Sequence, residues 1–589
     1  MDIQLGLAAI LVFGIFAQWI SWRFRLPSII LLLGVGFFLG PVTGFLKPDD
    51  LFGDLLFPFV SLSVAIILFE GGLGLTFSGL KAHGRVIRNL ITLGVLIAWV
   101  LIAFFAYFLF KLPALLAILL GAVLVVTGPT VIIPLLKQIH LKPSLAYVLR
   151  WEGIVVDPIG ATLAVLIFEM IVAGAGHDPL GLVVLVLGGT LFTGVVLGVL
   201  SALFLMIILK RHWIPGYLQE SLTLMTVIGV YVLSDVIQAE SGLLTVTVMG
   251  IVLANQRLVT IKHIVSFKEN ITILLLSTLF IVLAARIEWV ELVQFFHFNM
   301  FLFLFLLIVV VRPVCVFLCC LGSNFTLKER WFMALMAPRG IVAAAVISLF
   351  SIRLLAEGYE RSLELIPITF FVILVTVVFY GFMGVFLARF WGLSPSPNGI
   401  LIAGAHAWSR SLASLLKSYQ VPVTLVDTNK DNILEAKALD LPVIHGSILS
   451  KAVVDEVEMS SVKAFLAVTA SDKTNLLAVQ EYADILGDLN VYRLCPKDKS
   501  RELLVEKPEG KYLFSKGVTY SYLNARFLAG AKIKPIVFSS KYSYKEFKKA
   551  YPKAVYLFLV LKNKRVIIFN DDLKLTPDDG QVLIAMFDK

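Results

Sequence analysis

Two carboxylates interrupt an apolar stretch of this sequence. Glu152 and Asp157 lie in the segment 149–161, within a long apolar run, and Pro158 follows the aspartate directly. An ionised carboxylate at membrane depth costs at least about 2.5–3.5 kcal/mol, so it is rarely retained without a function. Proline removes a backbone N–H and disturbs the carbonyl one turn earlier. A kinked helix with a carboxylate at the kink predicts a site for a cation or a proton; the alternative is two carboxylates locked in ion pairs that serve packing.

The composition indicates that these residues belong to a membrane protein. Of the 589 residues, 59% are hydrophobic and 15% are charged, whereas soluble proteins average about 25% charged residues. The mean hydropathy is +0.92. The first apolar run lacks a basic start and a cleavage site, which predicts a retained span and not a signal peptide. Thirteen runs approach the roughly 20 residues that cross a bilayer, at about 3–20, 27–45, 56–77, 87–109, 112–137, 146–173, 181–209, 217–237, 240–256, 269–287, 295–320, 329–352 and 363–388.

The charges between these runs predict the topology. Alternate connections hold fifteen basic residues, such as Arg85 and Arg211, whereas the intervening connections hold five, mixed with acids. Because basic loops stay in the cytoplasm, the N-terminus is expected outside and the C-terminal part in the cytoplasm. The net charge of +10 follows from this topology and needs no nucleic-acid partner. The expected location is a bacterial inner (plasma) membrane, which the chain crosses several times.

Two of the thirteen runs contain residues that break helices. Gly128 and Pro129 interrupt the fifth run, and Pro338 and Gly340 interrupt the twelfth. Paired interruptions at matching depths are typical of inverted-repeat transporters, whose site lies where the broken helices meet. The freed carbonyls can replace part of an ion's hydration shell, because such backbone is tolerated where it lines a cavity. Ordinary proline kinks are the alternative for either run alone.

Helix geometry separates the two carboxylates of the sixth run. Glu152 and Asp157 are five residues apart, about 140° around a helix, so they face different directions. An arginine within an apolar run needs an anionic partner because it keeps its proton, and Arg312 and Arg339 are such residues. We expect Glu152 to form a structural ion pair with Arg339, and Asp157 to be the titrating ion ligand. Asp235 and Glu240 flank the junction of the eighth and ninth runs, where solvation is the simplest explanation, above all for Asp235.

The membrane part as a whole resembles the monovalent cation:proton antiporter superfamily, in particular its NhaP-type branch. The likeness rests on Arg312 and the segments 68–73, 127–130, 152–157, 240–255 and 337–340. It implies a polytopic α-helical fold of about thirteen helices with inverted repeats and two discontinuous crossing helices. It also implies a core bundle that moves against a dimerisation bundle, and exchange of Na⁺ or K⁺ for H⁺ by a homodimer. The four cysteines lack metal-ligand spacing, so no metal is expected beyond the transported cation.

The resemblance assigns roles to individual residues. It implies that Asp157 binds the ion with the help of Thr127 and Glu70. It also implies that the sixth-helix glutamate that pairs with an arginine is Glu152, with Arg339 as its partner.

Two positions depart from the family pattern. Val156 stands where relatives commonly have an asparagine, and Gly128 stands where they often have an aspartate. The site has therefore lost one amide and one carboxylate. A lone Asp157, helped by Thr127 and backbone carbonyls, could still exchange one cation for one proton by competition. We expect the ion site to be the least family-like part of the membrane domain, residues 1–392.

After residue 392 the composition changes to that of an α/β domain. A linker at 394–398 precedes a buried-strand pattern at 399–403, a turn and helix, and a second strand that ends at Asp427. This is the order of a dinucleotide-binding βαβ unit. Residues 399–510 resemble the Rossmann-like RCK (TrkA-N) domains, which regulate potassium channels and Kef-type antiporters. Residues 511–589 resemble a divergent RCK C-terminal subdomain.

The dinucleotide fingerprint of this domain is degenerate. Only Gly404 of its three glycines remains, because His406 and Ser409 occupy the other two positions. A side chain at 406 should obstruct the approach of a pyrophosphate, although the helix start retains an affinity for anions. We expect AMP, ADP, ATP or NAD(H) as the ligand; a domain that binds nothing is the alternative. The expected contacts are Gly404, His406, Ser409, Asp427, Asp472 and Asn475.

The favoured function is secondary-active antiport, with a role in pH homeostasis. A cation and a proton would compete for Asp157, and a nucleotide-binding RCK-like domain would regulate transport. A ligand-gated cation channel or a Kef-type efflux system is the alternative, although no filter-like sequence supports a channel. An oxidoreductase would rest on the Rossmann pattern alone, and a fold does not establish a reaction. The chain is therefore expected not to be an enzyme.

Overall fold

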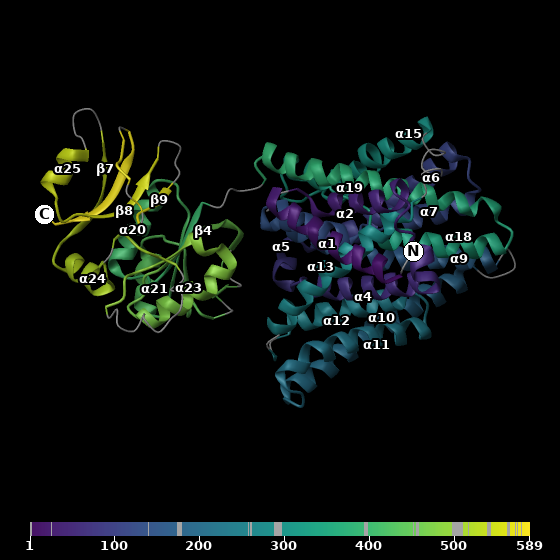
Figure 1. Cartoon of the computed structure of the whole chain (residues 1–589), viewed down its shortest axis with the longest axis horizontal. Helices are drawn as coiled ribbons and strands as arrows, with labels where there is room; N and C mark the ends of the chain where they lie inside the picture. Colours follow the sequence, from purple (N-terminus) through teal and green to yellow (C-terminus); the bar gives the residue numbers. More distant parts are fainter. Residues whose placement is uncertain are drawn as a thin grey trace. The chain divides into compact units, whose positions relative to one another are not determined.

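The computed structural model divides the chain into two compact units, Met1–Ser394 and Pro395–Lys589 (Figure 1). It describes residues 3–588 except for 25, 140, 174–178, 257, 260–261, 288–296, 394–397, 451–452, 455–456, 458, 498–509, 516, 539–543, 562–565, 572, 574 and 579.

The first unit is entirely helical in its described part. Among the described residues, nine helices are long and apolar enough to cross a membrane, and four shorter apolar helices lie in other predicted runs. The helices are α1 (Ile3–Phe24), α2 (Ser28–Phe37), α3 (Pro48–Phe52), α4 (Leu56–Leu73), α5 (Leu80–Asn89), α6 (Val95–Phe110), α7 (Ala114–Val125), α8 (Pro129–Ile139), α9 (Pro143–Ala173), α10 (Pro179–Lys210), α11 (Gln219–Ile237), α12 (Ser241–Asn255), α13 (Lys262–Ala285), α15 (Phe298–Leu306), α16 (Arg312–Cys319), α17 (Leu327–Ala334), α18 (Ile341–Ala356) and α19 (Leu365–Phe390).

The two predicted helix breaks are present. The fifth span consists of α7 and α8, with an extended gap at residues 126–128, and the twelfth consists of α17 and α18, with a gap at 335–340. Pro129 begins α8, where its missing N–H costs no helical hydrogen bond. The predicted fold of a helical membrane domain with two discontinuous helices is thereby confirmed.

The second unit contains a parallel sheet of the Rossmann type, as predicted. Six parallel strands have the order β3-β2-β1-β4-β5-β6. All five residues of β1 are buried, as expected of a strand with helices on both faces of its sheet. The strands are β1 (Gly399–Ala403), β2 (Val423–Asp427), β3 (Val443–His445), β4 (Val462–Ala467), β5 (Val491–Arg493) and β6 (Lys511–Tyr512), with helices α20 (Ala407–Ser418), α21 (Lys430–Ala438) and α23 (Asp472–Leu486).

A four-stranded antiparallel sheet of order β7-β10-β8-β9 follows in the same unit. Side chains from β1 and α20 share one hydrophobic core with side chains from β8 and β10, including Trp408, Leu557 and Ile584. The elements are β7 (Lys532–Val537), β8 (Val555–Val560), β9 (Val566–Ile568), β10 (Val582–Phe587), α24 (Tyr520–Leu528) and α25 (Tyr544–Ala550). The two sheets are therefore packed together, not tethered.

Candidate functional site

The two broken spans touch through their backbones. A Cβ atom added to Gly128 would lie 2.2 Å from the Cα of Gly340, and one added to Gly340 would lie 2.4 Å from the Cα of Gly128. The amide of Gly128 also donates to the carbonyl of Pro338, at 3.3 Å. Because neither position has room for a side chain, glycine at both is what allows the two breaks to meet.

Asp157 lies beside this crossing. In α9, Gly153 lies against Ile132 and Gly160 lies against Val126, where added Cβ atoms would come within 2.6 Å and 2.4 Å of those side chains. The α9 segment between the two glycines therefore runs past the break in the fifth span, and Asp157 is in that segment.

Several buried oxygens near the crossing have no hydrogen-bond partner among the described residues. Asp157 is completely buried, and within the described part of the chain neither of its carboxylate oxygens has a hydrogen-bond partner. The buried hydroxyls of Thr127 and Thr130 also have none among the described residues. Leaving a buried polar group unsatisfied costs about 1–3 kcal/mol, and more if it is charged. A cluster of such oxygens is suited to a bound cation or, on the carboxylate, a proton.

Glu152 forms a buried ion pair, but its partner is Arg312, so the predicted pairing with Arg339 was wrong. The guanidinium of Arg312 contacts both carboxylate oxygens, and its Nη2 donates to Oε2 at 2.8 Å. Only 8% of the Arg312 side chain and 5% of the Glu152 side chain are exposed. Such bidentate pairs are among the stronger charge-assisted hydrogen bonds.

Arg339 instead neutralises the end of a helix. Its Nη1 donates to the carbonyls of Val125 at 2.9 Å and Val126 at 3.4 Å, where α7 stops. The last carbonyls of a helix lack intrahelical partners and carry partial negative charge. The arginine of one broken span therefore binds the exposed end of the other, which explains why it needs no carboxylate as its direct partner.

We expect the Glu152→Gln substitution to lower the free energy of unfolding by about 3–5 kcal/mol, because Arg312 would remain buried without its counter-charge. A second substitution, Arg312→Met, should restore most of this loss, whereas Arg339→Met in the same background should not. Unfolding of the purified variants in detergent measures both effects. Recovery with Arg339→Met alone would contradict the pairing.

Two cavities lie at opposite halves of α4. One, of about 170 Å³, is lined by Ile67 and Glu70 near the end of α4 and also by Pro129, the first residue after the break. The other, of about 50 Å³, is lined by Phe57 near the start of α4 and by Glu240. Each cavity thus has one carboxylate in its wall. The sequence places Glu240 only at the junction of two spans, and this position alone does not reveal the cavity.

Four of the six predicted nucleotide contacts, Gly404, His406, Ser409 and Asp427, lie at the carboxyl ends of β1 and β2. The polar side-chain atoms of Asp427 and Ser409, however, already form hydrogen bonds within the domain. Asp427 Oδ2 accepts from the amide of Ala405 at 2.7 Å and from Asn432 Nδ2 at 2.9 Å. Its Oδ1 accepts from the amide of Asn429 at 2.8 Å. The hydroxyl of Ser409 donates to the carbonyl of Gly404, at 2.7 Å.

The turn at Gly404, whose φ is +115°, is covered by two side chains. The ring of His406 stands edge-on to that of Tyr520, with ring centroids 4.8 Å apart. Its Nε2 lies 3.1 Å from the place that a Cβ of Gly404 would take. Burial lowers the pKa of His406 despite the nearby Asp427, which disfavours the charged imidazole that a phosphate would attract. The residues as arranged do not fit a pyrophosphate at this turn.

The remaining two predicted contacts are also occupied within the domain. Asp472 Oδ2 accepts from the amide of Lys497 at 3.0 Å. Asn475 Oδ1 accepts from the amide of Thr469 at 2.9 Å and from its hydroxyl at 2.7 Å, and Asn475 Nδ2 donates to the carbonyl of Thr469. Asn475 therefore holds the loop that follows β4, and Asp472 binds the loop that follows β5.

Comparison with known proteins agrees with this architecture. Residues 7–389 match the family described as "Sodium/hydrogen exchanger, transmembrane", and residues 400–507 match the TrkA-N domain. The chain is 26% identical to Na(+)/H(+) antiporter 1 of Methanocaldococcus jannaschii, over 60% of this chain and 84% of that protein. It is 24% identical to the K(+)/H(+) antiporter NhaP2 of a Shewanella species, over 67% and 68%.

A solved structure supports the same conclusion. The structure of the sodium proton antiporter MjNhaP1 from Methanocaldococcus jannaschii aligns with a TM-score of 0.56 and 25% identity, over 67% of this chain and all of that one. These relatives are transporters and not enzymes, in agreement with the prediction. Because the family match at residues 7–389 covers more than half of the sequence, the chain belongs to the sodium/hydrogen exchanger family, and it carries a TrkA-N domain after its membrane part.

Proposed function

We propose that the chain exchanges Na⁺ or K⁺ for H⁺ by competition of the cation and the proton for Asp157. The observation that carries the proposal is the burial of this carboxylate, without a hydrogen-bond partner in the described chain, beside two touching helix breaks. An isolated ionised carboxylate is too costly to leave in such a place. Asp157 must therefore hold either a proton or a cation, and each excludes the other.

The surrounding groups support a coupling of one cation to one proton. Thr127 and the freed carbonyls of the break can supply neutral oxygen ligands, while Gly128 adds no carboxylate and the buried Val156 adds no amide. One negative charge is neutralised by one monovalent cation or by one proton. Exchange with this stoichiometry moves no net charge, so its rate should not depend on membrane potential.

Alternating access is supported by the two cavities. We assign Glu70 and Glu240 to opposite entry paths that meet at the crossing, with Glu70 also in reach of the ion site. The Glu152–Arg312 pair joins α9 to α16, and Arg312 also donates to the carbonyl of Met336 in the break of the twelfth span. The bonds from Arg339 to α7 join the two broken spans to each other. These elements would then move as one body against the remaining helices, in a homodimer with its N-terminus outside and residues 399–589 in the cytoplasm of a bacterium.

The basic test uses the full-length protein in proteoliposomes that contain a pH-sensitive dye. We expect a pH gradient to be dissipated when Na⁺ or K⁺ is added, with no current and no dependence on membrane potential. A cation channel would instead pass current that reverses at the equilibrium potential of the cation. Such a current, without coupled proton movement, would refute the antiport proposal.

Glu240→Gln is expected to raise the cation concentration for half-maximal exchange about tenfold, because a charge in a narrow cleft concentrates counter-ions. The maximal rate should change little, since the substitution leaves Asp157 in place. The effect should appear when the cation is added on the side that the smaller cavity faces. A matched Glu220→Gln variant, in the first turn of α11, should leave both values unchanged.

A further inference from the structure

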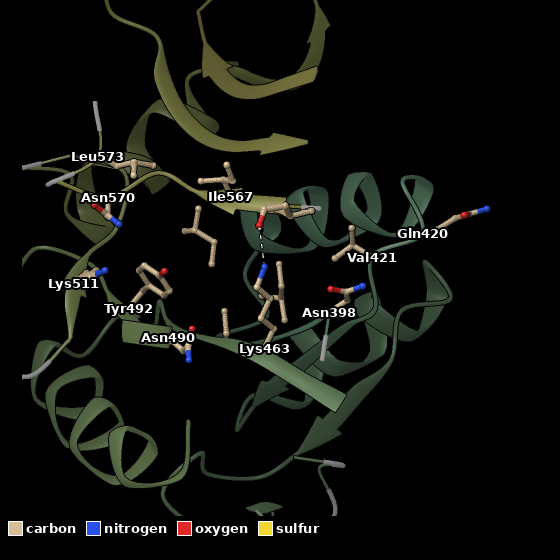
Figure 2. Close-up of a pocket in the computed structure, with 14 residues that line it drawn as sticks. Asn398, Gln420, Val421, Lys463, Asn490, Tyr492, Lys511, Ile567, Asn570 and Leu573 are labelled. Carbon is tan, nitrogen blue, oxygen red and sulfur yellow. Dashed lines mark hydrogen bonds between the residues drawn. The ribbon is translucent and has the colours of Figure 1, made fainter. Parts of the chain in front are cut away.

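A cavity of about 360 Å³ lies at the end of the parallel sheet opposite to the Gly404 turn (Figure 2). Its wall includes Ile400 at the start of β1, Ala464 at the start of β4 and Tyr492 in β5, with β9 of the second sheet above them. The volume falls in the range of about 300–1,000 Å³ that is typical of small-molecule sites. Nothing in the Rossmann pattern predicts a site at this amino-terminal end of the strands.

The charge of the cavity favours an anion. Among the residues that the structure describes, its lining contains two lysines, Lys463 and Lys511, and no acidic residue. Within the described chain neither lysine forms an ion pair, and Lys463 Nζ has one weak contact, 3.5 Å from the carbonyl of Val566. Cations without counter-charges in a cleft with low-dielectric walls concentrate anions.

The other lining groups favour a ligand that also has a planar or apolar body. Figure 2 shows Tyr492 and Lys463 on the sheet side of the cavity, with Lys511 and Asn570 at one end and Asn398 nearer the other. A tyrosine ring offers a face for stacking, and amide side chains can donate to and accept from ring edges or hydroxyls. Apolar walls come from Val421, Ile567 and Ile568.

The position of the cavity would let a ligand hold the two sheets together. On one side are β4, β5 and β6, and on the other are β9 and the residues that follow it. The sheets are already joined here by the bridge between Leu513 and Asn570 and by the amide of Phe514, which donates to Phe569 at 2.8 Å. A ligand that contacts these lysines, which belong to the parallel sheet, and also Ile567 of β9 would add a third connection.

We propose that this cavity, and not the turn at Gly404, is the ligand site of the C-terminal unit. The ligand class is an organic phosphate of nucleoside monophosphate size, with its phosphate bound by both Lys463 and Lys511 and its ring against Tyr492. The binding claim stands on the cavity alone, whereas an effect of the ligand on transport rests on the proposed function.

The test measures binding to the full-length protein in detergent by calorimetry, with AMP, adenosine and inorganic phosphate as probes. AMP is expected to bind saturably, and Lys463→Gln and Lys511→Gln should each weaken its binding about tenfold, the effect of losing a charged hydrogen bond. Two control variants should bind AMP normally: Lys417→Gln, whose lysine pairs with Asp440 outside the cavity, and Asp427→Asn at the Gly404 turn.

Three outcomes would overturn the proposal. They are no binding of AMP, loss of binding in Asp427→Asn with normal binding in both cavity variants, and inorganic phosphate binding as tightly as AMP. The thermal unfolding temperature of each variant without ligand shows that it has folded. Because no transport is measured, a failure here leaves the antiport proposal untouched, and a failed exchange assay leaves this site untouched.

Discussion

Asp157→Asn is expected to abolish cation-driven proton movement in proteoliposomes. Asparagine has nearly the same shape as aspartate, so the packing of α9 beside the break should persist. It cannot take up a proton, however, and it offers a cation no negative charge. Both halves of the proposed exchange are therefore lost together, and the pH-dye signal should fall to that of liposomes without protein.

The matched control for this variant is Glu169→Gln, which removes a carboxylate from an exposed position of the same helix. We expect it to transport at the rate of the unmodified protein. Thermal unfolding in detergent should show that both variants are folded. Undiminished exchange in Asp157→Asn would end the assignment of this residue, whereas loss of exchange in both variants would point to a general defect of α9.

The membrane part could be predicted well because its signals are local. A bilayer demands long apolar runs, so the spans are visible in the sequence. Gly128, Pro129, Pro338 and Gly340 break helices by their own chemistry, wherever they are placed. The burial of Asp157 also follows from its apolar neighbours.

The partner of Arg339 could not be predicted because it is not a side chain. A sequence alone suggests pairing each buried arginine with a buried acid, and Glu152 was the acid assigned to Arg339. Its actual partner is the other buried arginine, Arg312. The carbonyls at the end of α7 become acceptors only once the helix stops at Val125 and the second break lies against it. The side chains that cover the Gly404 turn could be predicted only in part, because one of them comes from a distant segment. His406 was expected to obstruct the turn, whereas Tyr520 is more than a hundred residues further along the chain.

The cavity at the amino ends of the strands was outside the reach of motif analysis for a related reason. Lys463 and Lys511 come from strands far apart in the sequence, and Asn570 comes from the segment that follows β9 of the second sheet. No spacing rule connects them. Their meeting depends on the packing of two sheets, which a fingerprint for one βαβ unit does not describe.

Gly128→Ala and Gly340→Ala are each expected to remove most exchange activity and to destabilise the membrane unit by about 1–3 kcal/mol, the cost of overpacking a tight contact. The new methyl group would meet the Cα of the opposite glycine, and backbone cannot rotate away as a side chain can. The φ of Gly340 is −100°, which any residue adopts, so the effect is steric. Separating the breaks would also draw the carbonyls of α7 away from Arg339.

The control for these alanines is Gly188→Ala in α10, where an added Cβ would have no neighbour within 4 Å. Alanine is favoured over glycine in a helix by about 1 kcal/mol, so this variant should be slightly more stable and fully active. Unfolding in detergent and the pH-dye assay measure both quantities on the same samples. If the alanines at 128 and 340 left exchange intact, close backbone contact between the breaks could not be a requirement of the transport cycle. The carboxylate of Asp157 would then have to act without a rigid crossing beside it.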